Sequence, residues 1–538
     1  MAQLEKETSR PAHVEDRDVE SAFEAASIAK EGNSTSVMGT VKLTEGAIIY
    51  IPTPTADPQD PLNMKRWQKV AVVIVISIFS TLGLSLISGL GGLLGFYIPQ
   101  YEAAGKSYAD ISALMTYPNV FMGIGNLIGM PIAYAVGRRV VLLGSTVILV
   151  IAAAMCAVAD SYDFHLWSRC FLGLAAGQSE ALVPMITQEI FFLHERSQGL
   201  MIQHTVQVTL TTIWVLFASP IAEAITPEWW YGLGGILAGV QFVTAFFLVP
   251  ETKYERPLTS FQESGSDSEP AAQQMCTEKP PLDTVTFAPR TFRSDLRLFV
   301  GTPDWKLGWR TFRHTFELLL YPQVFWAMCL NGLTLGCNVG IGTTYGNILT
   351  NAPYNWPQSS VSYINCGQIV TALVALPVFG YGSDMIIKWF ANRRGGLHEP
   401  EIRLIPVVLP IIVGTITAVL YGQGATHPDQ YHWFTYAWTI AAYYFCFVGA
   451  NIVAITYLLD SYPTRAGPLL IIICAFRGII SFGVSYGITP MTDSLGFDGA
   501  FGVFGGLTAA FGLLGIAVYF SGKKLRAITG RFTKDKED

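Results

Sequence analysis

The chain has 538 residues, of which 51% are hydrophobic and only 14% are charged. Soluble domains usually carry about 25% charged residues, so this composition argues against a water-soluble enzyme. The formal net charge of -6 comes from 34 basic and 40 acidic residues, which argues against nucleic-acid binding because no uniform basic surface can form. The eight cysteines form no Cys-x-x-Cys pair, so the sequence predicts neither a metal site nor a redox motif.

Apolar runs long enough to cross a membrane recur along the chain. A hydrocarbon core of about 30 Å requires about 20 apolar residues per helix. Continuous runs such as VAVVIVISIF exclude the alternating pattern of a transmembrane β-barrel. The sequence therefore predicts an all-α integral membrane protein with twelve transmembrane helices. They are expected at about 70–98, 111–136, 140–159, 164–188, 199–225, 231–250, 322–349, 360–382, 404–422, 433–459, 468–490 and 499–520.

Polar segments divide these helices into two groups of six. The predicted parts are a disordered tail at 1–68, a six-helix half at 69–250, a linker at 251–321, a second half at 322–520 and a tail at 521–538. The linker begins with a stretch rich in Ser, Glu, Pro and Thr, which is typical of disorder. It ends in LGWRTFRHTFELLL, where aromatic residues and Arg recur at helical spacing and predict an interfacial helix.

The distribution of basic residues predicts the orientation. Lys and Arg are retained on the cytoplasmic side during membrane insertion. If the N-terminus is cytoplasmic, all of the 34 basic residues except Lys106, Arg169 and Arg477 fall in the tails or the cytoplasmic loops. We therefore expect both termini and the linker in the cytoplasm, and we expect the protein to lie in the plasma membrane.

The sequence lacks the motifs of a catalyst or of ATP-driven transport. A phosphate-binding loop needs G-x-x-x-x-G-K-[ST], but the one Gly-Lys-Ser, at 105–107, has Gln100 in the position of the first glycine. Neither an HExxH motif nor a G-x-S-x-G motif occurs in a context that would suit catalysis. The chain is expected not to be an enzyme and to use no cofactor. A bundle of two similar halves favours alternating access, with conduction as the less favoured alternative because no filter-like repeat occurs.

Ionisable residues inside the predicted spans indicate where a transport site lies. Each costs roughly 2.5–3.5 kcal/mol or more at a helix centre, so it usually forms a pair or lines a path. Arg169 and Glu180 lie on one face of the fourth span, and Arg477 is in the eleventh. The alternative is structural: Arg169 reaches the headgroups and Glu180 is a neutral, hydrogen-bonded carboxyl. We expect Glu180 to couple transport to protons, with Arg169 on the same face.

Polar side chains at helical spacing extend the predicted site. The residues expected to bind substrate are Gln203, Gln207, Asn331, Asn338, Asn365, Gln368, Tyr444 and Arg477. Such stripes can instead be hydrogen bonds between helices, worth about 0.6 kcal/mol each.

Several segments resemble the major facilitator superfamily. PIAYAVGRR at 131–139 is similar to its G-x-L-a-D-R-x-G-R-R loop, and LWSRCFLGLAAG at 166–177 is similar to its second motif. DPLNMKRW at 60–67 and VPETKYER at 249–256 are more specific. They resemble the fungal branch of the twelve-spanner drug:proton antiporters, including its polyamine-transporter-like members, and the resemblance covers about 60–520.

The resemblance assigns further roles. It implies a gating motif formed by Gly137, Arg138, Arg139 and Asp384. In the motif between the second and third spans, the acidic position is occupied by Tyr134, which departs from the superfamily pattern. The antiporter motif of the fifth helix has also lost its glycines, and Glu223 becomes a candidate replacement for proton coupling.

The leading prediction is a monomeric, proton-coupled secondary transporter. Its partners would be a small organic substrate, protons and the lipid bilayer, and its task the export of a fungal secondary metabolite or xenobiotic by antiport. One alternative is uptake of organic cations such as polyamines, favoured by the carboxylates at 180 and 223. Another is a membrane sensor that keeps the fold but transports nothing.

Overall fold

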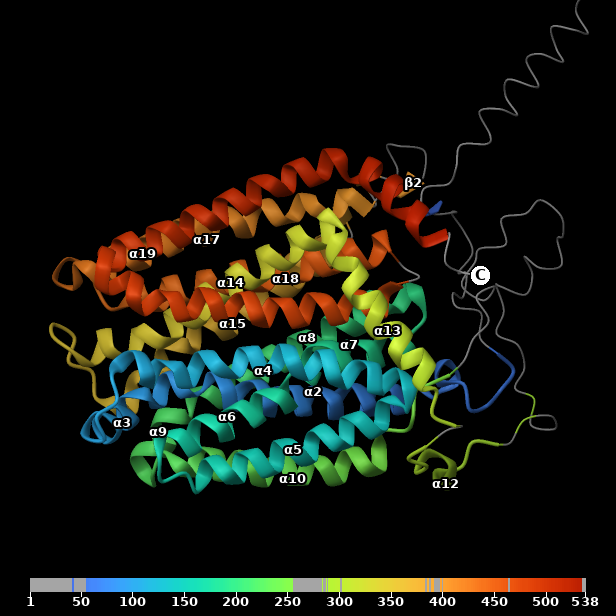
Figure 1. The fold of residues 1–538 in the computed structure, drawn as a ribbon, viewed down its shortest axis with the longest axis horizontal. Coiled ribbons are helices and arrows are strands. Elements are labelled where there is room, and N and C mark those ends of the chain that lie inside the picture. Colours follow the sequence, from blue (N-terminus) through green and yellow to red (C-terminus); the bar gives the residue numbers. More distant parts are fainter. Residues whose placement is uncertain are drawn as a thin grey trace, which may run out of the picture.

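The computed structural model is a helical bundle, and its described residues include one very short strand pair, β1 (Val41–Lys42) antiparallel to β2 (Leu397–His398). The structure describes residues 41–42, 55–254, 283, 287, 289–299, 302–382, 385–386, 389–390, 397–398, 400–462 and 465–534. Figure 1 shows long helices running side by side, with the N-terminal half (blue to green) below the C-terminal half (yellow to red).

The helices of the N-terminal half follow the predicted spans. They are α2 (Arg66–Ser88), α3 (Leu90–Ala103), α4 (Tyr108–Ala135), α5 (Arg138–Ala157), α6 (Tyr162–Ala176), α7 (Gln178–Ile190), α8 (Leu193–Leu216), α9 (Ala218–Ala224) and α10 (Glu228–Leu248). Three predicted spans are thus each built of two consecutive helices: α2 with α3, α6 with α7, and α8 with α9.

The linker and the C-terminal half contain longer helices and several short ones. The α-helices are α12 (Phe292–Asp295), α13 (Trp305–Glu317), α14 (Pro322–Thr350), α15 (Cys366–Ala375), α17 (Val408–Thr426), α18 (Phe434–Ser461) and α19 (Ala466–Lys534). The 3-10 helices are η1 (Pro61–Asn63), η3 (Leu318–Leu320), η4 (Gln358–Asn365), η6 (Pro400–Val407) and η7 (Pro428–Gln430), and η5 (Leu376–Tyr381) is a π-helix.

The described residues contain twelve candidate membrane-spanning segments. Among the described residues, 10 helical stretches are long and apolar enough to cross a membrane. The last of them, Ala466–Thr529, is two helices, because the backbone leaves the helical region at Gly496. α4 lies outside the 10 but has 28 residues and packs between α6 and α19 within the bundle. With that stretch counted twice and α4 added, the all-α fold with two six-helix halves is confirmed.

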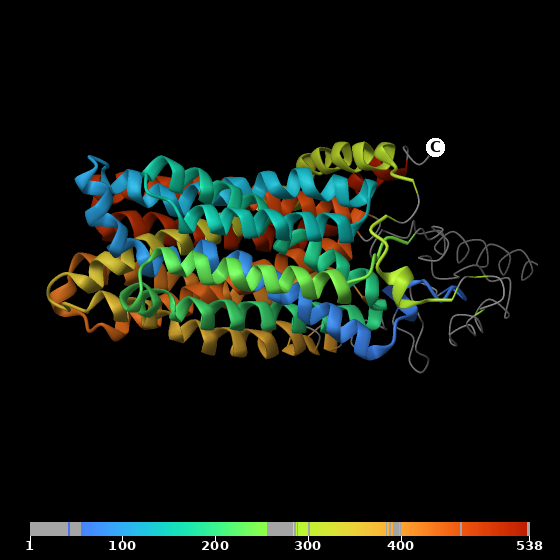
Figure 2. The same cartoon turned by 90° about the horizontal axis from the view of Figure 1, so that it is seen from below.

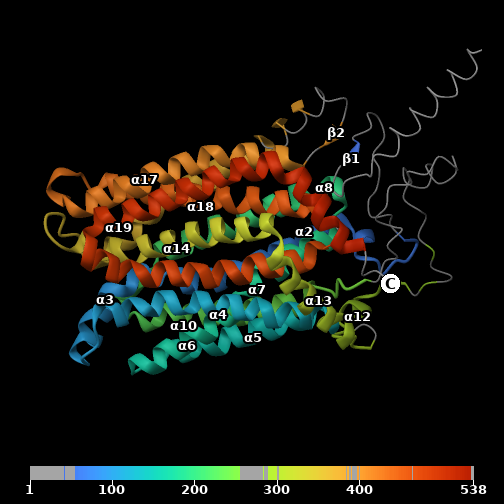
Figure 3. The same cartoon turned by 45° about the horizontal axis from the view of Figure 1, so that its top comes forward.

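The two ends of the bundle differ. We call the end that carries α12 and α13 the linker end and the other the opposite end (Figures 1 and 2). The opposite end carries the short connections at 104–107, 158–161, 225–227 and 427–433. Figure 3 shows α3 at the opposite end and α12 at the linker end.

Each half has its own apolar core, while apolar side chains also cover the outside. One core cluster belongs to residues 64–249, joined by Ile471 and Cys474 of α19, and two belong to the C-terminal half. Large exposed apolar side chains include Ile151, Ile236, Val240, Ile416 and Leu513. Exposed apolar surface on this scale is unfavourable in water and is the expected surface of helices that face lipid.

Part of the segment predicted as a disordered tail is ordered. Asp60 is fully buried, and its carboxylate accepts hydrogen bonds from the Leu62 backbone N–H and the Thr55 hydroxyl. The Thr55 hydroxyl in turn lies 3.1 Å from the Tyr254 hydroxyl, beyond the end of α10. Residues 55–65 therefore form a cap on the linker end of the N-terminal half.

Candidate functional site

A pocket lies between the two halves. Its walls come from α7 and α8 of the N-terminal half and from α15, η5, η6, α18 and α19 of the C-terminal half. Its cavity volume is about 150 Å³. Cavities of this volume in other proteins can bind a molecule of the size of benzene. The lining runs from Glu180 and Arg477 towards Gln188 and Leu459, close to the linker-end termini of α7 and α18.

An ion pair crosses this pocket. The Arg477 guanidinium on α19 contacts the Glu180 carboxylate on α7, and the side chains are only 4% and 14% exposed. The two helices also meet through Cys474, whose Sγ donates to the backbone carbonyl of Glu180 at 3.2 Å. The sequence predicted a role for both charged residues, but their pairing across the halves is a finding of the structure.

Several buried polar groups around the pair lack a hydrogen-bond partner among the described residues. They include Nε of Arg477, Nε2 of His204, Nε2 of Gln188 and Oγ of Ser179. An unpartnered buried polar group usually costs 1–3 kcal/mol, so each is an available contact for a ligand. The nitrogens of Arg477 and Gln188 can only donate a hydrogen bond, whereas the Ser179 hydroxyl and the His204 ring nitrogen can donate or accept.

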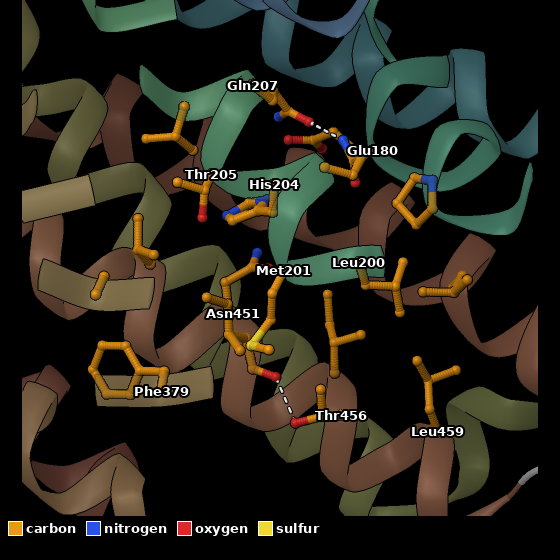
Figure 4. Close-up of a pocket in the computed structure, with 18 of the residues that line it drawn as sticks. Glu180, Leu200, Met201, His204, Thr205, Gln207, Phe379, Asn451, Thr456 and Leu459 are labelled. Atoms are coloured by element: carbon orange, nitrogen blue, oxygen red, sulfur yellow. Dashed lines mark hydrogen bonds between the residues drawn. The ribbon is translucent and has the colours of Figure 1, made fainter. Parts of the chain in front are cut away.

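The pocket also holds a glutamine pair from α8. The Gln203 amide donates to Oε1 of Gln207 at 2.8 Å, which leaves the Gln207 amide nitrogen available to a ligand. Figure 4 shows Gln207, His204, Thr205 and Met201 on the same side of the pocket, with Asn451 and Phe379 facing them from the C-terminal half.

Other residues of the pocket were not predicted from the sequence. His204 follows Gln203 directly in the fifth predicted span, and Asn451 is an isolated polar residue in an apolar run. Both could therefore have been predicted from the sequence as residues of a polar site. Asn451 is 7% exposed and its amide hydrogen-bonds to no other described residue. Phe379 and Thr456 gave no signal, because aromatic and Thr residues are common in lipid-facing and core positions.

The other predicted substrate contacts lie outside the described lining of the pocket. Asn331 is fully buried and its amide donates to the Ala327 carbonyl, one turn earlier. The amide of Asn365 donates to the Tyr345 hydroxyl and accepts from Gln368. Three of the eight predicted substrate contacts line the pocket, namely Gln203, Gln207 and Arg477. The five that lie outside its described lining are Asn331, Asn338, Asn365, Gln368 and Tyr444.

The structure separates the other two coupling candidates from Glu180. Arg169 is fully buried and donates to the carbonyls of Leu114 and Ile87 at 2.8 Å and to the Tyr231 hydroxyl at 2.6 Å. These contacts tie α6 to α2, α4 and α10. Glu223 is exposed on α9, at the opposite end. Neither residue lines the pocket.

The predicted gating motif builds a polar network at the linker end. The Arg138 guanidinium pairs with Glu189 on α7 at 2.7 Å. The Arg139 guanidinium donates to the carbonyls of Asp295 and Arg297, in the linker, at 2.6 and 2.9 Å. The two arginines therefore contact carboxylate and carbonyl groups, as expected of residues that hold helix ends. Asp384 lies outside the described residues.

Gly137 allows this network to form. Its φ of 146° is one that side chains with a Cβ rarely adopt, and a Cβ there would lie 2.3 Å from the Glu251 carboxylate. That carboxylate accepts from the backbone N–H groups of Arg138 and Arg139, so it caps the first turn of α5.

The halves also meet at the opposite end. The Ser219 hydroxyl on α9 lies 2.7 Å from the Ser362 hydroxyl on η4. The Tyr108 hydroxyl on α4 donates to the Thr343 carbonyl on α14 at 2.8 Å. The described structure thus has its halves joined at the opposite end and a pocket that extends towards the linker end.

Comparison with other proteins gives a consistent assignment. Residues 73–468 match the Major Facilitator Superfamily. Protein HOL1 of Saccharomyces cerevisiae is 23% identical, with 91% of this chain and 92% of that protein covered. The MFS-type transporter penM of Penicillium rubens is 24% identical (87% and 88% covered), and the multidrug transporter AQR1 of Candida glabrata is 22% identical (84% and 76%).

Solved structures give the same fold. The human organic anion transporter MFSD10 (TETRAN) matches with a TM-score of 0.54 and 15% identity, covering 83% of this chain and 99% of that one. A partially occluded inward open conformation of the xylose transporter XylE from E. coli matches with a TM-score of 0.56 and 13% identity, covering 85% and 98%. Because the family match spans most of both six-helix halves, the chain belongs to the Major Facilitator Superfamily and is a multi-pass membrane transporter rather than an enzyme.

Proposed function

We propose that this chain is a proton-coupled secondary transporter that moves a small organic compound by alternating access, with Glu180 as the group that carries the proton. The observation that supports this most is the buried pair of Glu180 and Arg477, whose partners belong to different halves. Such a pair links the protonation state of one side chain to the relative position of the halves.

The link follows from the energetics of buried charge. Removing one partner of a buried ion pair costs about 3–5 kcal/mol, because the other charge is left uncompensated. Protonation of Glu180 neutralises the carboxylate and removes its attraction for Arg477, which then needs another acceptor. We propose that the pair is ionised in the arrangement seen here and that protonation of Glu180 accompanies the change to the other arrangement.

The lining favours a mainly apolar substrate with hydrogen-bond acceptors. Most lining side chains are apolar, among them Met201, Val208, Phe379 and Ile452. Glu180 is the single acid among the described lining residues and is already paired with Arg477. A polyamine would find no free carboxylate there, which makes uptake of organic cations the less supported alternative.

We propose that the linker end faces the cytoplasm, on the basis of the basic residues concentrated in the tails and linker. The arrangement described here is then inward-facing. Export at the plasma membrane, in the manner of the fungal drug:proton antiporters, is the proposed direction. Its support is that a relative at 22% identity is named a multidrug transporter. We propose that the chain acts as a monomer, because its own two halves together supply the walls of the pocket.

Transport by the purified full chain in vesicles with an imposed pH gradient tests this proposal. A panel of fungal metabolites and xenobiotics is screened for gradient-driven accumulation. Glu180→Gln is expected to abolish accumulation while leaving substrate exchange partly intact, and Arg477→Ala to impair both. Glu223→Gln is the matched control, because it removes the same charge from an exposed site outside the pocket.

The opposite result places coupling elsewhere. If Glu180→Gln accumulates substrate like the parent while Glu223→Gln does not, the proton is carried by α9 and not by the pair. If the parent binds compounds from the panel but moves none in either direction, the chain is the sensor considered above.

A further inference from the structure

A short helix of the linker lies against the outside of the bundle. α13 begins next to the end of α4, where the Asp304 backbone N–H donates to the Ala135 carbonyl at 3.0 Å. Gly308 packs against the same helix so closely that a Cβ would lie 2.9 Å from the Pro131 carbonyl oxygen. The first half of α13 is thus attached to the N-terminal half.

The other end of α13 is attached to the C-terminal half. Glu317 lies 3.8 Å from the guanidinium of Arg465, which directly precedes α19. α13 also packs along α19, and Figure 1 shows it running obliquely across both halves at the linker end. Its last residue leads through Leu318–Leu320 into α14, which starts at Pro322. Because α14 crosses the membrane, the end of α13 is fixed at the membrane boundary.

α13 presents aromatic side chains away from the bundle. Its buried residues are Gly308, Thr311 and Thr315. Trp305 and Trp309 are 62% and 69% exposed, and they share one face with Phe312 and Phe316 at 100° per residue. Ring centroids are 5.6 Å apart for Trp309 and Phe312, and 5.0 Å for Phe312 and Phe316. The aromatic side chains form a stripe along one face of α13, in which Phe312 is half-buried and the others are exposed.

A basic stripe runs beside the aromatic one. Lys306, Arg310 and Arg313 are exposed and lie about 80° to 140° around the helix from Trp305. Arg313 also contacts Glu317 at 3.2 Å. An exposed aromatic stripe next to a basic stripe is the arrangement of helices that lie in the membrane interface. Anionic lipids attract juxtamembrane bases there by about 1 kcal/mol for each residue.

We propose that α13 is a membrane-interfacial strap that binds anionic phospholipid headgroups through Lys306, Arg310 and Arg313, with Trp305 and Trp309 inserted at the boundary of the acyl chains. The occupant is a lipid and not a soluble protein, because α13 continues directly into a transmembrane helix and its aromatic stripe would otherwise face water. Since α13 holds both halves, the bound lipid contacts the element that joins them. This site is independent of the substrate and of proton coupling.

Fluorescence quenching by brominated lipids tests the proposal. The full chain is reconstituted into phosphatidylcholine vesicles that contain either brominated phosphatidylglycerol or brominated phosphatidylcholine at the same mole fraction. The fluorescence of the two α13 tryptophans is obtained as the difference in tryptophan fluorescence between the parent and the variant Trp305→Phe/Trp309→Phe. We expect phosphatidylglycerol to quench this fluorescence more strongly. The preference for phosphatidylglycerol is the ratio of the quenching by the two brominated lipids. The triple variant Lys306→Gln/Arg310→Gln/Arg313→Gln should lower this preference at least ~fivefold.

Two controls make the result decisive. The charge-preserving variant Lys306→Arg/Arg310→Lys/Arg313→Lys should retain the preference, which separates loss of charge from loss of folding. Lys65→Gln/Arg66→Gln removes exposed bases at the start of α2, also at the linker end, and should leave it unchanged. Three outcomes overturn the proposal: no quenching of the α13 tryptophans by either lipid, equal quenching by both lipids, or the same loss in the α2 variant.

Discussion

The hydroxyl oxygens of Ser219 and Ser362 lie 2.7 Å apart at the end of the bundle opposite the linker. One belongs to α9 of the N-terminal half and the other to η4 of the C-terminal half. A Cβ on Gly92 would lie 2.1 Å from the Ser362 hydroxyl, so a residue without a side chain is needed for this close approach. The contact is a seam that must open if the pocket is to reach the opposite end.

Cross-linking this seam should stop transport. Because the hydroxyls already touch, Ser219→Cys/Ser362→Cys is expected to form a disulfide under mild oxidation and to hold the halves together. Transport should fall to background when the pair is oxidised and return after reduction. A protease site inserted in the linker provides the measurement, since cleaved halves migrate together on a gel only when cross-linked.

Each single cysteine variant is the control for oxidation elsewhere in the chain. Transport at the parent rate by a fully cross-linked protein would mean that the halves do not separate at this seam.

The Glu180 and Arg477 pair should show strong energetic coupling. Glu180→Gln and Arg477→Gln are each expected to lower the free energy of unfolding by about 3–5 kcal/mol, because each leaves a buried charge without its partner. The double variant should lose much less than the sum of the two. Denaturation of the parent, the two single variants and the double variant gives the four free energies of unfolding that this double-mutant cycle requires. Additive losses would show that the two side chains do not stabilise one another.

The arginines of the gating motif should affect rate more than affinity. Arg138 pairs with Glu189 and Arg139 with linker carbonyls, and neither arginine lines the pocket. Arg138→Gln/Arg139→Gln is expected to lower the maximal transport rate about tenfold, or ~1.4 kcal/mol on the barrier, with little change in the half-saturating concentration. Initial rates over a range of substrate concentrations separate the two quantities.

Glu189→Gln should reproduce the loss caused by Arg138→Gln, since it removes the partner of the same ion pair. A weakened affinity with an unchanged maximal rate would move these arginines from gating to substrate binding.

In intact cells, the linker should be protected from a protease added outside. We expect an added protease to cleave the linker only after the membrane is opened, because basic segments remain in the cytoplasm. Immunoblotting of a C-terminal tag measures the cleavage. A site placed in the connection at 427–433, at the opposite end, should show the reverse pattern, and cleavage of the linker in sealed cells would invert the proposed orientation.

Much of the fold could be predicted from the sequence, for a simple physical reason. A helix in lipid must satisfy its own backbone hydrogen bonds and present an apolar surface, so each span leaves a long apolar run in the sequence. The predicted runs match the described helices, including the run at 111–136, where α4 falls short of the apolarity of the others. The breaks within spans, such as Gly89 between α2 and α3, were not predicted because they depend on what packs beside them.

The sequence by itself determined which polar residues are unusual, while the tertiary structure decided which of them meet. Glu180, Arg169 and Arg477 are all conspicuous as charges in apolar runs. Helical spacing places Glu180 on the face of Arg169, yet its partner is Arg477, which is 297 residues away in the chain and on another helix. Periodicity reports the face of one helix and not the neighbour across from it. Contacts between halves depend on how two separately packed cores dock, which no local pattern records.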